Sequence, residues 1–136
     1  MTKGLLLIAF VYFFTINSAR DTQVLQELRL NFQNIESEDD IQRILDWSLD
    51  PDDPNVLTAK SYQAASKCMM AEYVFSPVKK LKYFNQGKTS LEELIAEEKS
   101  VEKVYLRLLI QMESPRLLNY YKNIDEDIAF LVAELP

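Results

Sequence analysis

Apolar residues recur at helical spacing along most of the chain, and no segment shows the sustained alternation of apolar and polar residues that is typical of a strand. The pattern predicts an all-α fold with about six helices after residue 19. Ser37 and Ser76 are good N-caps, and Pro77 suits the first position of the helix that follows it. The expected helices cover residues 21–34, 37–49, 55–75, 77–99 and 101–113, with a short helix near 116–122 and a last helix after 123.

Two consecutive helices are expected to approach each other closely. The helix over residues 55–75 mixes small and large residues along one face. The next helix carries Gly87 beside its apolar stripe, and a glycine inside a helix costs roughly 1 kcal/mol relative to alanine. We therefore expect Gly87 to permit a close contact or a bend. The predicted buried stripe of this helix consists of Leu81, Phe84, Leu91 and Ile95.

The helix over residues 101–113 is apolar around well over half of its circumference, so it is expected at the centre of the fold. Short connections favour neighbouring antiparallel helices. The sequence therefore predicts an array of antiparallel helical hairpins, either TPR-like or an orthogonal helical bundle. Residues 84–112 have some tetratricopeptide character, but no repeat of that length is visible elsewhere. In the last helix, Ile128, Leu131 and Leu135 are the expected apolar residues.

The first 19 residues have the layout of a secretory signal peptide. Lys3 precedes an unbroken apolar run over residues 5–14, and small and polar residues follow it up to Ala19. Ala19 suits the position directly before the cleavage site, where signal peptides carry a small residue. Asn17, two residues earlier, is larger than the residues usually found at that position. The alternative is a buried first helix. With cleavage after Ala19, residues 20–136 form a single all-α domain.

Composition removes several classes of chemistry. The 136 residues include no histidine, one cysteine and two glycines, and the formal net charge is −6. Histidine-based metal sites and catalytic triads are excluded, as are an internal disulfide and a glycine-rich phosphate loop. We expect no cofactor and no metal. An acidic chain should also repel nucleic acid.

Three segments in the second half resemble one group of proteins. These are FSPVKKLKYFNQGK at residues 75–88, the R-x-x-x-Q-x-x-x-P pattern at 107–115 and the acidic K-x-I-x-E-D pattern at 122–127. They are similar to small exported helical proteins of Bacteroidota that lack an assigned function. The resemblance implies export and an all-α fold, and it implies no catalytic residues.

The main basic cluster lies at the start of the helix over residues 77–99. It could form an anion site helped by the helix dipole, or its lysines could extend along the surface and pair with nearby acids. The lysines of the cluster are Lys79, Lys80, Lys82 and Lys88. The partner-binding groove that we predict combines Lys80, Tyr83, Lys88, Arg107 and Tyr121.

Arg107 lies on a largely buried helix and therefore needs a carboxylate or several carbonyl acceptors. The acidic residues at 125–127 are the expected partners, which makes a structural clamp the main interpretation and a ligand contact the alternative. The acidic loop at residues 50–55 fails the EF-hand pattern, since Asn55 stands where glycine is required. Cys68 lies away from the predicted stripe and has no histidine to activate it, so a structural thiol is expected, with intermolecular pairing as the alternative.

These observations predict an exported, non-catalytic interaction module of the periplasm or cell envelope, secreted or periplasmic, with a protein or peptide as its partner. No nucleic acid partner and no stable membrane span after signal cleavage are expected. A structural or oligomeric envelope subunit is the first alternative. A hydrolase that acts through paired carboxylates is the second, since two of the 21 acidic residues could meet in the fold.

Overall fold

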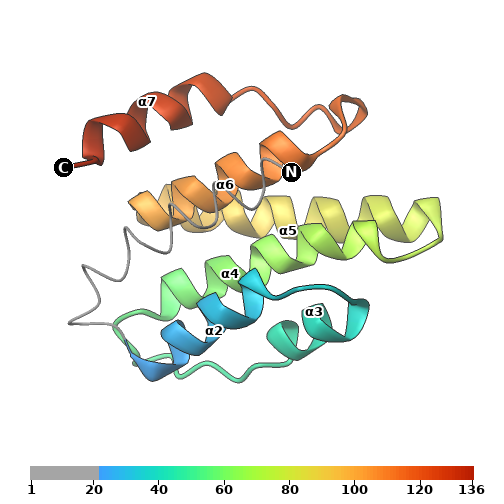
Figure 1. The fold of residues 1–136 in the computed structure, drawn as a ribbon, viewed down its shortest axis with the longest axis horizontal. Helices are drawn as coiled ribbons and strands as arrows, with labels where there is room; N and C mark the ends of the chain where they lie inside the picture. The colour runs from blue at the N-terminus through green and yellow to red at the C-terminus, as the bar shows by residue number, and fades with distance from the viewer. Residues whose placement is uncertain (1–21) are drawn as a thin grey trace.

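The computed structural model describes residues 22–136, and the predicted signal peptide at residues 1–19 lies outside the described residues. This part of the chain is all-α, as predicted: it forms six α-helices and two 3₁₀ helices, and it contains no strand. From α4 onwards the helices run back and forth across the molecule (Figure 1). The elements are α2 (Gln23–Gln33), α3 (Glu38–Leu45), α4 (Val56–Met69), η2 (Met70–Glu72), α5 (Pro77–Glu97), α6 (Val101–Glu113), η3 (Arg116–Leu118) and α7 (Ile124–Glu134).

Serine side chains start three of these helices. The hydroxyl of Ser37 accepts a hydrogen bond from the backbone N–H of Asp40, and Ser76 caps α5 in the same way. Both N-caps were predicted from the sequence. Ser100 caps α6 through the backbone N–H of Lys103. Each of these hydroxyls satisfies an N–H group that has no partner inside its helix.

Three predicted helices are shorter in the structure than their apolar patterns suggested. α3 ends at Leu45 instead of residue 49. At this end the side-chain amide of Gln63 donates to the carbonyls of Ile44 and Trp47, which would otherwise lack a partner within the helix. α4 ends at Met69 and tightens into η2. The expected helix at 116–122 is only the 3₁₀ helix η3, because Asn119 adopts a left-handed conformation with φ of 52°.

α4 and α5 approach each other closely at Gly87. A β-carbon at this position would lie 2.6 Å from the backbone oxygen of Ala64 and 2.6 Å from the backbone nitrogen of Cys68. Such distances are shorter than van der Waals contact, so only glycine fits. The predicted close contact is therefore confirmed, and Cys68, which was expected to be a buried or half-buried structural thiol, lies in the hydrophobic core.

α6 lies between other helices and is buried over nearly its whole length. It packs against α4, α5 and α7, and it lies between α7 and α4 in Figure 1. All of its residues from Glu102 to Gln111 are buried. The prediction that this helix occupies the centre of the fold is confirmed.

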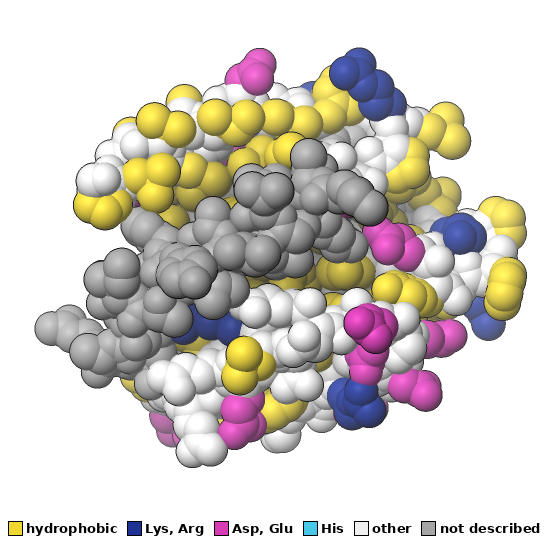
Figure 2. All heavy atoms as spheres, in the orientation of Figure 1, with side chains coloured by type: hydrophobic (Ala, Val, Ile, Leu, Met, Phe, Trp, Pro, Cys, Tyr) yellow, Lys and Arg dark blue, Asp and Glu magenta, His cyan; other side chains and the backbone are white. Residues whose placement is uncertain are grey.

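Three apolar positions that were expected inside are exposed. Leu81 is 50% exposed, because the first turns of α5 leave a hollow between this helix and the end of α6. Ile128 and Leu135 are also exposed, and Leu131 is only partly buried. The reason is that α7 lies on the outer side of α6, so Asp127 is its only buried residue. Figure 2 shows hydrophobic side chains along the exposed side of α7.

No helix within residues 22–136 is both long enough and apolar enough to cross a membrane. The arrangement of these helices as a TPR-like array or an orthogonal bundle stays a prediction.

Candidate functional site

Arg107 on α6 forms a buried ion pair with α7. Its Nε donates to Oδ2 of Asp127 at 2.9 Å, and its Nη2 donates to Oδ1 of the same carboxylate. Gln111, one turn further along α6, donates to Asp127 Oδ2 at 2.8 Å. The structure thus gives Arg107 the acidic partner that the sequence suggested, and it selects Asp127 from the three acids at 125–127. This contact fixes α7 on α6.

Glu92 of α5 extends the same cluster towards the surface. Its Oε2 accepts from Nη1 of Arg107 at 2.9 Å, and its Oε1 accepts from the hydroxyl of Tyr120 at 2.6 Å. Lys88 Nζ lies 4.9 Å from the centre of the Tyr120 ring, at cation–π distance. Burial, followed by the hydrogen bond to Glu92, raises the pKa of Tyr120. The hydroxyl therefore stays protonated and acts as a donor that holds Glu92.

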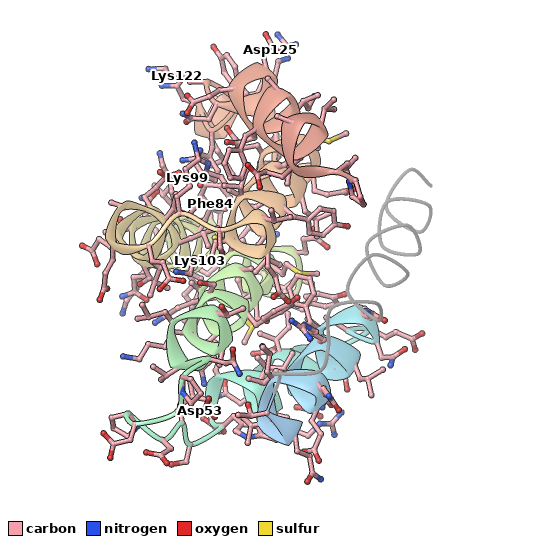
Figure 3. All side chains as sticks on the ribbon, turned by 90° about the vertical axis from the view of Figure 1, so that its left-hand side faces the viewer. Asp53, Phe84, Lys99, Lys103, Lys122 and Asp125 are labelled. Atoms are coloured by element: carbon pink, nitrogen blue, oxygen red, sulfur yellow. The ribbon has the colours of Figure 1, made fainter. Side chains whose placement is uncertain are left out.

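A second buried polar cluster lies at the start of α6. Glu102 accepts two hydrogen bonds from Arg29 of α2, at 2.6 Å and 2.8 Å, and a third from the hydroxyl of Tyr62. The ammonium group of Lys103 donates to the backbone carbonyls of Leu94 (3.4 Å) and Glu98 (2.7 Å) at the end of α5. Figure 3 shows Lys103 inside the molecule, whereas Lys122 and Asp125 lie at its outer edge. Every charged group that α6 buries therefore has an internal partner.

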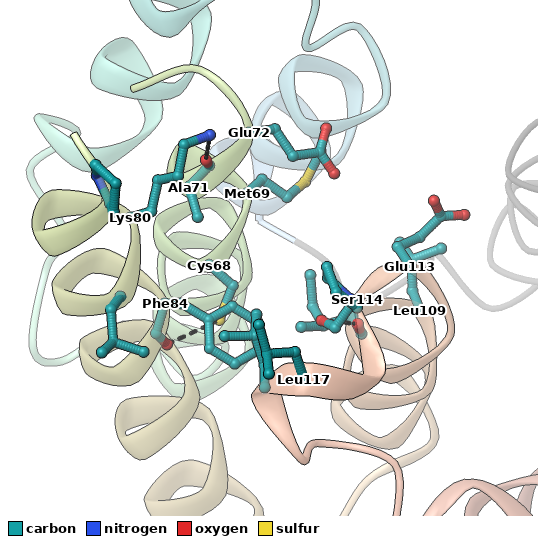
Figure 4. Close-up of a pocket in the computed structure, with 15 residues that line it drawn as sticks. Cys68, Met69, Ala71, Glu72, Lys80, Phe84, Leu109, Glu113, Ser114 and Leu117 are labelled. Carbon is teal, nitrogen blue, oxygen red and sulfur yellow. Dashed lines mark hydrogen bonds between the residues drawn. The ribbon is translucent and has the colours of Figure 1, made fainter. Parts of the chain in front are cut away.

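A pocket of about 640 Å³ lies at the opposite end of α6, where η2, the first turns of α5 and η3 meet (Figure 4). Its size falls in the range of small-molecule and side-chain binding pockets. Both Ser-Pro pairs of the sequence border it, through Pro77, Ser114 and Pro115. The apolar part of the wall consists of Cys68, Met69, Ala71, Pro77, Leu81, Phe84, Leu109, Ile110, Pro115, Leu117 and Leu118.

Large apolar side chains are exposed around this pocket. Leu117 on η3 is 93% exposed, and Leu81 on α5 is half exposed. Phe75, at 99%, and Val78, at 79%, flank the lining residue Pro77 in the sequence. Isolated apolar residues are common on protein surfaces, but a cluster of them around an apolar pocket is typical of a binding site.

Cys68 forms part of the pocket wall, but it is not prepared for chemistry. Its side chain is buried, and its Sγ lies 3.7 Å from the carbonyl oxygen of Phe84. Burial raises the pKa of the thiol to about 12, although the nearby positive charge of Lys88 acts in the opposite direction. At neutral pH the group is a thiol and a poor nucleophile. The structure is in agreement with the expected structural role.

The five residues of the predicted groove do not lie on one open surface. Lys80 lines the pocket, and Tyr83 packs partly buried against the core. Lys88 and Arg107 belong to the cluster around Glu92. Tyr121 is exposed beside Arg116, and its neighbour Tyr120 takes the place in the cluster that the sequence interpretation gave to Tyr121. The residues that the sequence reasoning missed include Glu72, Glu113 and Leu117, for which the apolar residues around the two Ser-Pro pairs were the available signal.

The acidic loop before α4 forms local turns. Asp50 Oδ1 accepts from the backbone N–H of Asp52, and Asp53 Oδ1 accepts from that of Asn55. Within residues 22–136 there is no group of three or more cysteine, aspartate or glutamate side chains that could hold a metal ion.

No family model, no curated protein and no solved structure matches this chain. The structure therefore defines the class of the protein only as all-α, and its function has to be argued from the pocket and its surroundings.

Proposed function

We propose that this protein is a non-catalytic interaction module that holds apolar side chains of a peptide or protein partner in the pocket between η2, α5, α6 and η3. The observation that carries the proposal is the apolar pocket of about 640 Å³, whose lining includes the exposed residues Leu81 and Leu117. Placing these side chains against a partner would remove apolar area from water, which favours association.

The polar clusters support a non-catalytic function. Glu102 and Asp127, the two buried carboxylates among residues 22–136, are each held by an arginine and by further donors. Their arrangement serves packing between helices, as does the paired Arg107. The pocket itself presents mainly apolar groups, which suit recognition better than proton transfer.

The proposal also places the protein outside the cytoplasm, in the periplasm or cell envelope. It rests on the signal-like sequence of residues 1–19 and on the resemblance to exported helical proteins. Mass spectrometry of the protein purified from its native host tests this part. A mature chain that begins at residue 20 is the expected result, and a chain that retains residues 1–19 would contradict it.

The binding function can be tested by selecting peptides from a displayed library against the wild-type protein. The selected peptides are then measured against the double variant Leu81→Gln and Leu117→Gln, which removes apolar surface at the pocket. Leu30→Gln is the matched control, because Leu30 is similarly exposed on α2. We expect binding to fall at least about tenfold in the double variant and to persist in the control. Equal binding by all three proteins would contradict the proposal.

A second candidate function, that of a structural subunit, rests on α7. This helix exposes Ile128, Val132 and Leu135 along one side, and Val132 is 62% exposed. Light scattering distinguishes the two functions. A dimer that Val132→Glu converts to a monomer would favour the subunit, whereas a wild-type monomer would count against it.

A further inference from the structure

The charges at the mouth of the pocket have different surroundings from those inside the protein. Glu72 and Glu113 both line the pocket and are exposed, and neither forms an ion pair with any residue of the described part of the chain. Lys80 is the only lysine of the lining, and its Nζ donates to the carbonyl oxygen of Ala71 at 3.1 Å. Figure 4 shows both carboxylates at the edge of the apolar side chains.

The other basic residues nearby do not neutralise these carboxylates. Pro77, Lys80, Leu81 and Phe84 show which face of α5 lines the pocket, and helical spacing directs Lys79 and Lys82 to the opposite side. Arg116 is not part of the lining, and its guanidinium lies 5.6 Å from the centre of the Tyr121 ring. As far as the basic residues within 22–136 are concerned, the two carboxylates therefore remain available to a partner.

Acidic side chains also lie near Tyr73, the residue after Glu72, although one of them, Asp40, is paired with Arg43. Burial, followed by the negative charges of Glu72, Asp40 and Glu36, raises the pKa of Tyr73. The chain as a whole carries a net charge of −6, so its long-range field also favours the approach of a cation.

We propose that the partner segment is an amphipathic basic peptide that places its apolar side chains in the pocket and a lysine or arginine beside Glu72 and Glu113. The proposal rests on the proposed function and adds the charge of the partner. An amphipathic helix suits this surface, because apolar residues at every third or fourth position reach the pocket and its exposed lining residues Leu81 and Leu117 together. An acidic segment would meet two carboxylates that have no ion-pair partner in the described part of the chain, which disfavours it.

The test uses three capped amphipathic peptides of about twelve residues with the same leucine and alanine positions. Their polar positions carry lysine, glutamine or glutamate, and their binding to the full chain is measured by fluorescence anisotropy. We expect the lysine peptide to bind most tightly and the glutamate peptide most weakly. In the variant Glu72→Gln with Glu113→Gln, affinity for the lysine peptide should fall about threefold to tenfold, while affinity for the glutamine peptide should not change.

Glu93→Gln with Glu97→Gln is the matched control, since both residues are exposed on α5 and do not line the pocket. This control should bind all three peptides like the wild type. Salt gives a second readout, because it screens the interaction between the peptide charges and the carboxylates. Raising the salt from about 20 to 200 mM should bring the affinities of the lysine and glutamate peptides closer to that of the glutamine peptide, whose own affinity should not change.

The outcomes separate the charge of the partner from the binding function itself. If the three peptides bind equally and all lose affinity in the variant Leu81→Gln with Leu117→Gln, the charge proposal is overturned and the binding function stands. If the lysine peptide binds equally well to the wild type, to the variant Leu81→Gln with Leu117→Gln and to the variant Glu72→Gln with Glu113→Gln, the charge proposal and the binding function are both overturned. If no peptide binds, the charge proposal is overturned, and the library selection decides the binding function.

Discussion

The middle of α6 and the pocket at its end differ in how their charged side chains are buried and paired. Glu102 and Arg107 are buried, and each is enclosed by partners from other helices. Glu72 and Glu113 are exposed beside an apolar pocket and have no ion-pair partner within the described residues. Buried charges must be paired because an unpaired one is costly, whereas an exposed carboxylate stays solvated until a partner arrives. We therefore assign folding to the first region and propose binding for the second.

The largest expected effect comes from removing a buried carboxylate. Asp127→Ala leaves Arg107 and Gln111 without their acceptor, and we expect the free energy of unfolding to fall by about 3–5 kcal/mol. Urea denaturation measures it. Asp125→Ala, an exposed residue of the same helix turn, should cost about 1 kcal/mol or less. Equal losses in the two variants would show that the buried ion pair contributes no more to the free energy of unfolding than an exposed carboxylate does.

The next effect concerns the contact between α4 and α5. Gly87→Ala places a β-carbon against backbone atoms of Ala64 and Cys68, which cannot move without separating the helices. We expect a loss of about 3 kcal/mol in the free energy of unfolding. Ser90→Ala, on the exposed side of α5, should change stability by about 0.5 kcal/mol at most. A neutral Gly87→Ala variant would contradict the close contact.

Cys68 gives a smaller effect that depends on pH. In the unfolded chain its thiol loses a proton near pH 8.5, whereas the folded thiol, with a pKa of about 12, stays protonated. Stability is therefore fully present below about pH 8.5 and falls as the pH rises towards 12, by about 2 kcal/mol at pH 10. The change in stability between pH 7.5 and 10 should be smaller by that amount in Cys68→Ala. An identical pH dependence in both proteins would argue against a buried thiol.

The smallest effect should come from Ser66, whose buried hydroxyl has no hydrogen-bond partner within the described part of the chain. Ser66→Ala removes the unsatisfied group with little change in shape. We expect stability to stay equal or rise by up to about 1 kcal/mol. Thermal unfolding tests it, and a clear loss of stability would mean that the hydroxyl has a function that its surroundings do not show.

The sequence predicted the helices well where burial sets a strong period. The apolar residues of 101–113 led directly to the central position of α6, and Gly87 indicated the close contact with α4. The prediction from the sequence failed where tertiary contacts decide where a helix ends or which of its sides is buried. Gln63 ends α3 from a distant position in the chain, and α7 contacts its neighbours on one side only, so Leu135 remains exposed.

The candidate site was harder to predict than the fold. Periodicity on single helices grouped Lys80 with Lys88 and Arg107. Once α5 and α6 are packed, Lys80 lines the pocket, whereas Lys88 and Arg107 belong to the cluster around Glu92. The pocket combines the ends of five elements, and its walls come from residues as distant in sequence as Cys68 and Leu118. Such a site depends on the relative positions of helix ends, which single-helix patterns do not specify.

The central claim is that binding takes place at the pocket and not at the buried clusters. Nuclear magnetic resonance tests it most directly, by titrating the isotope-labelled protein with a peptide selected from the displayed library and following its backbone amides. We predict that the largest shifts fall within residues 68–84 and 109–118, around the pocket. Shifts concentrated on α7, or around Glu92 and Arg107 with the pocket unaffected, would contradict it.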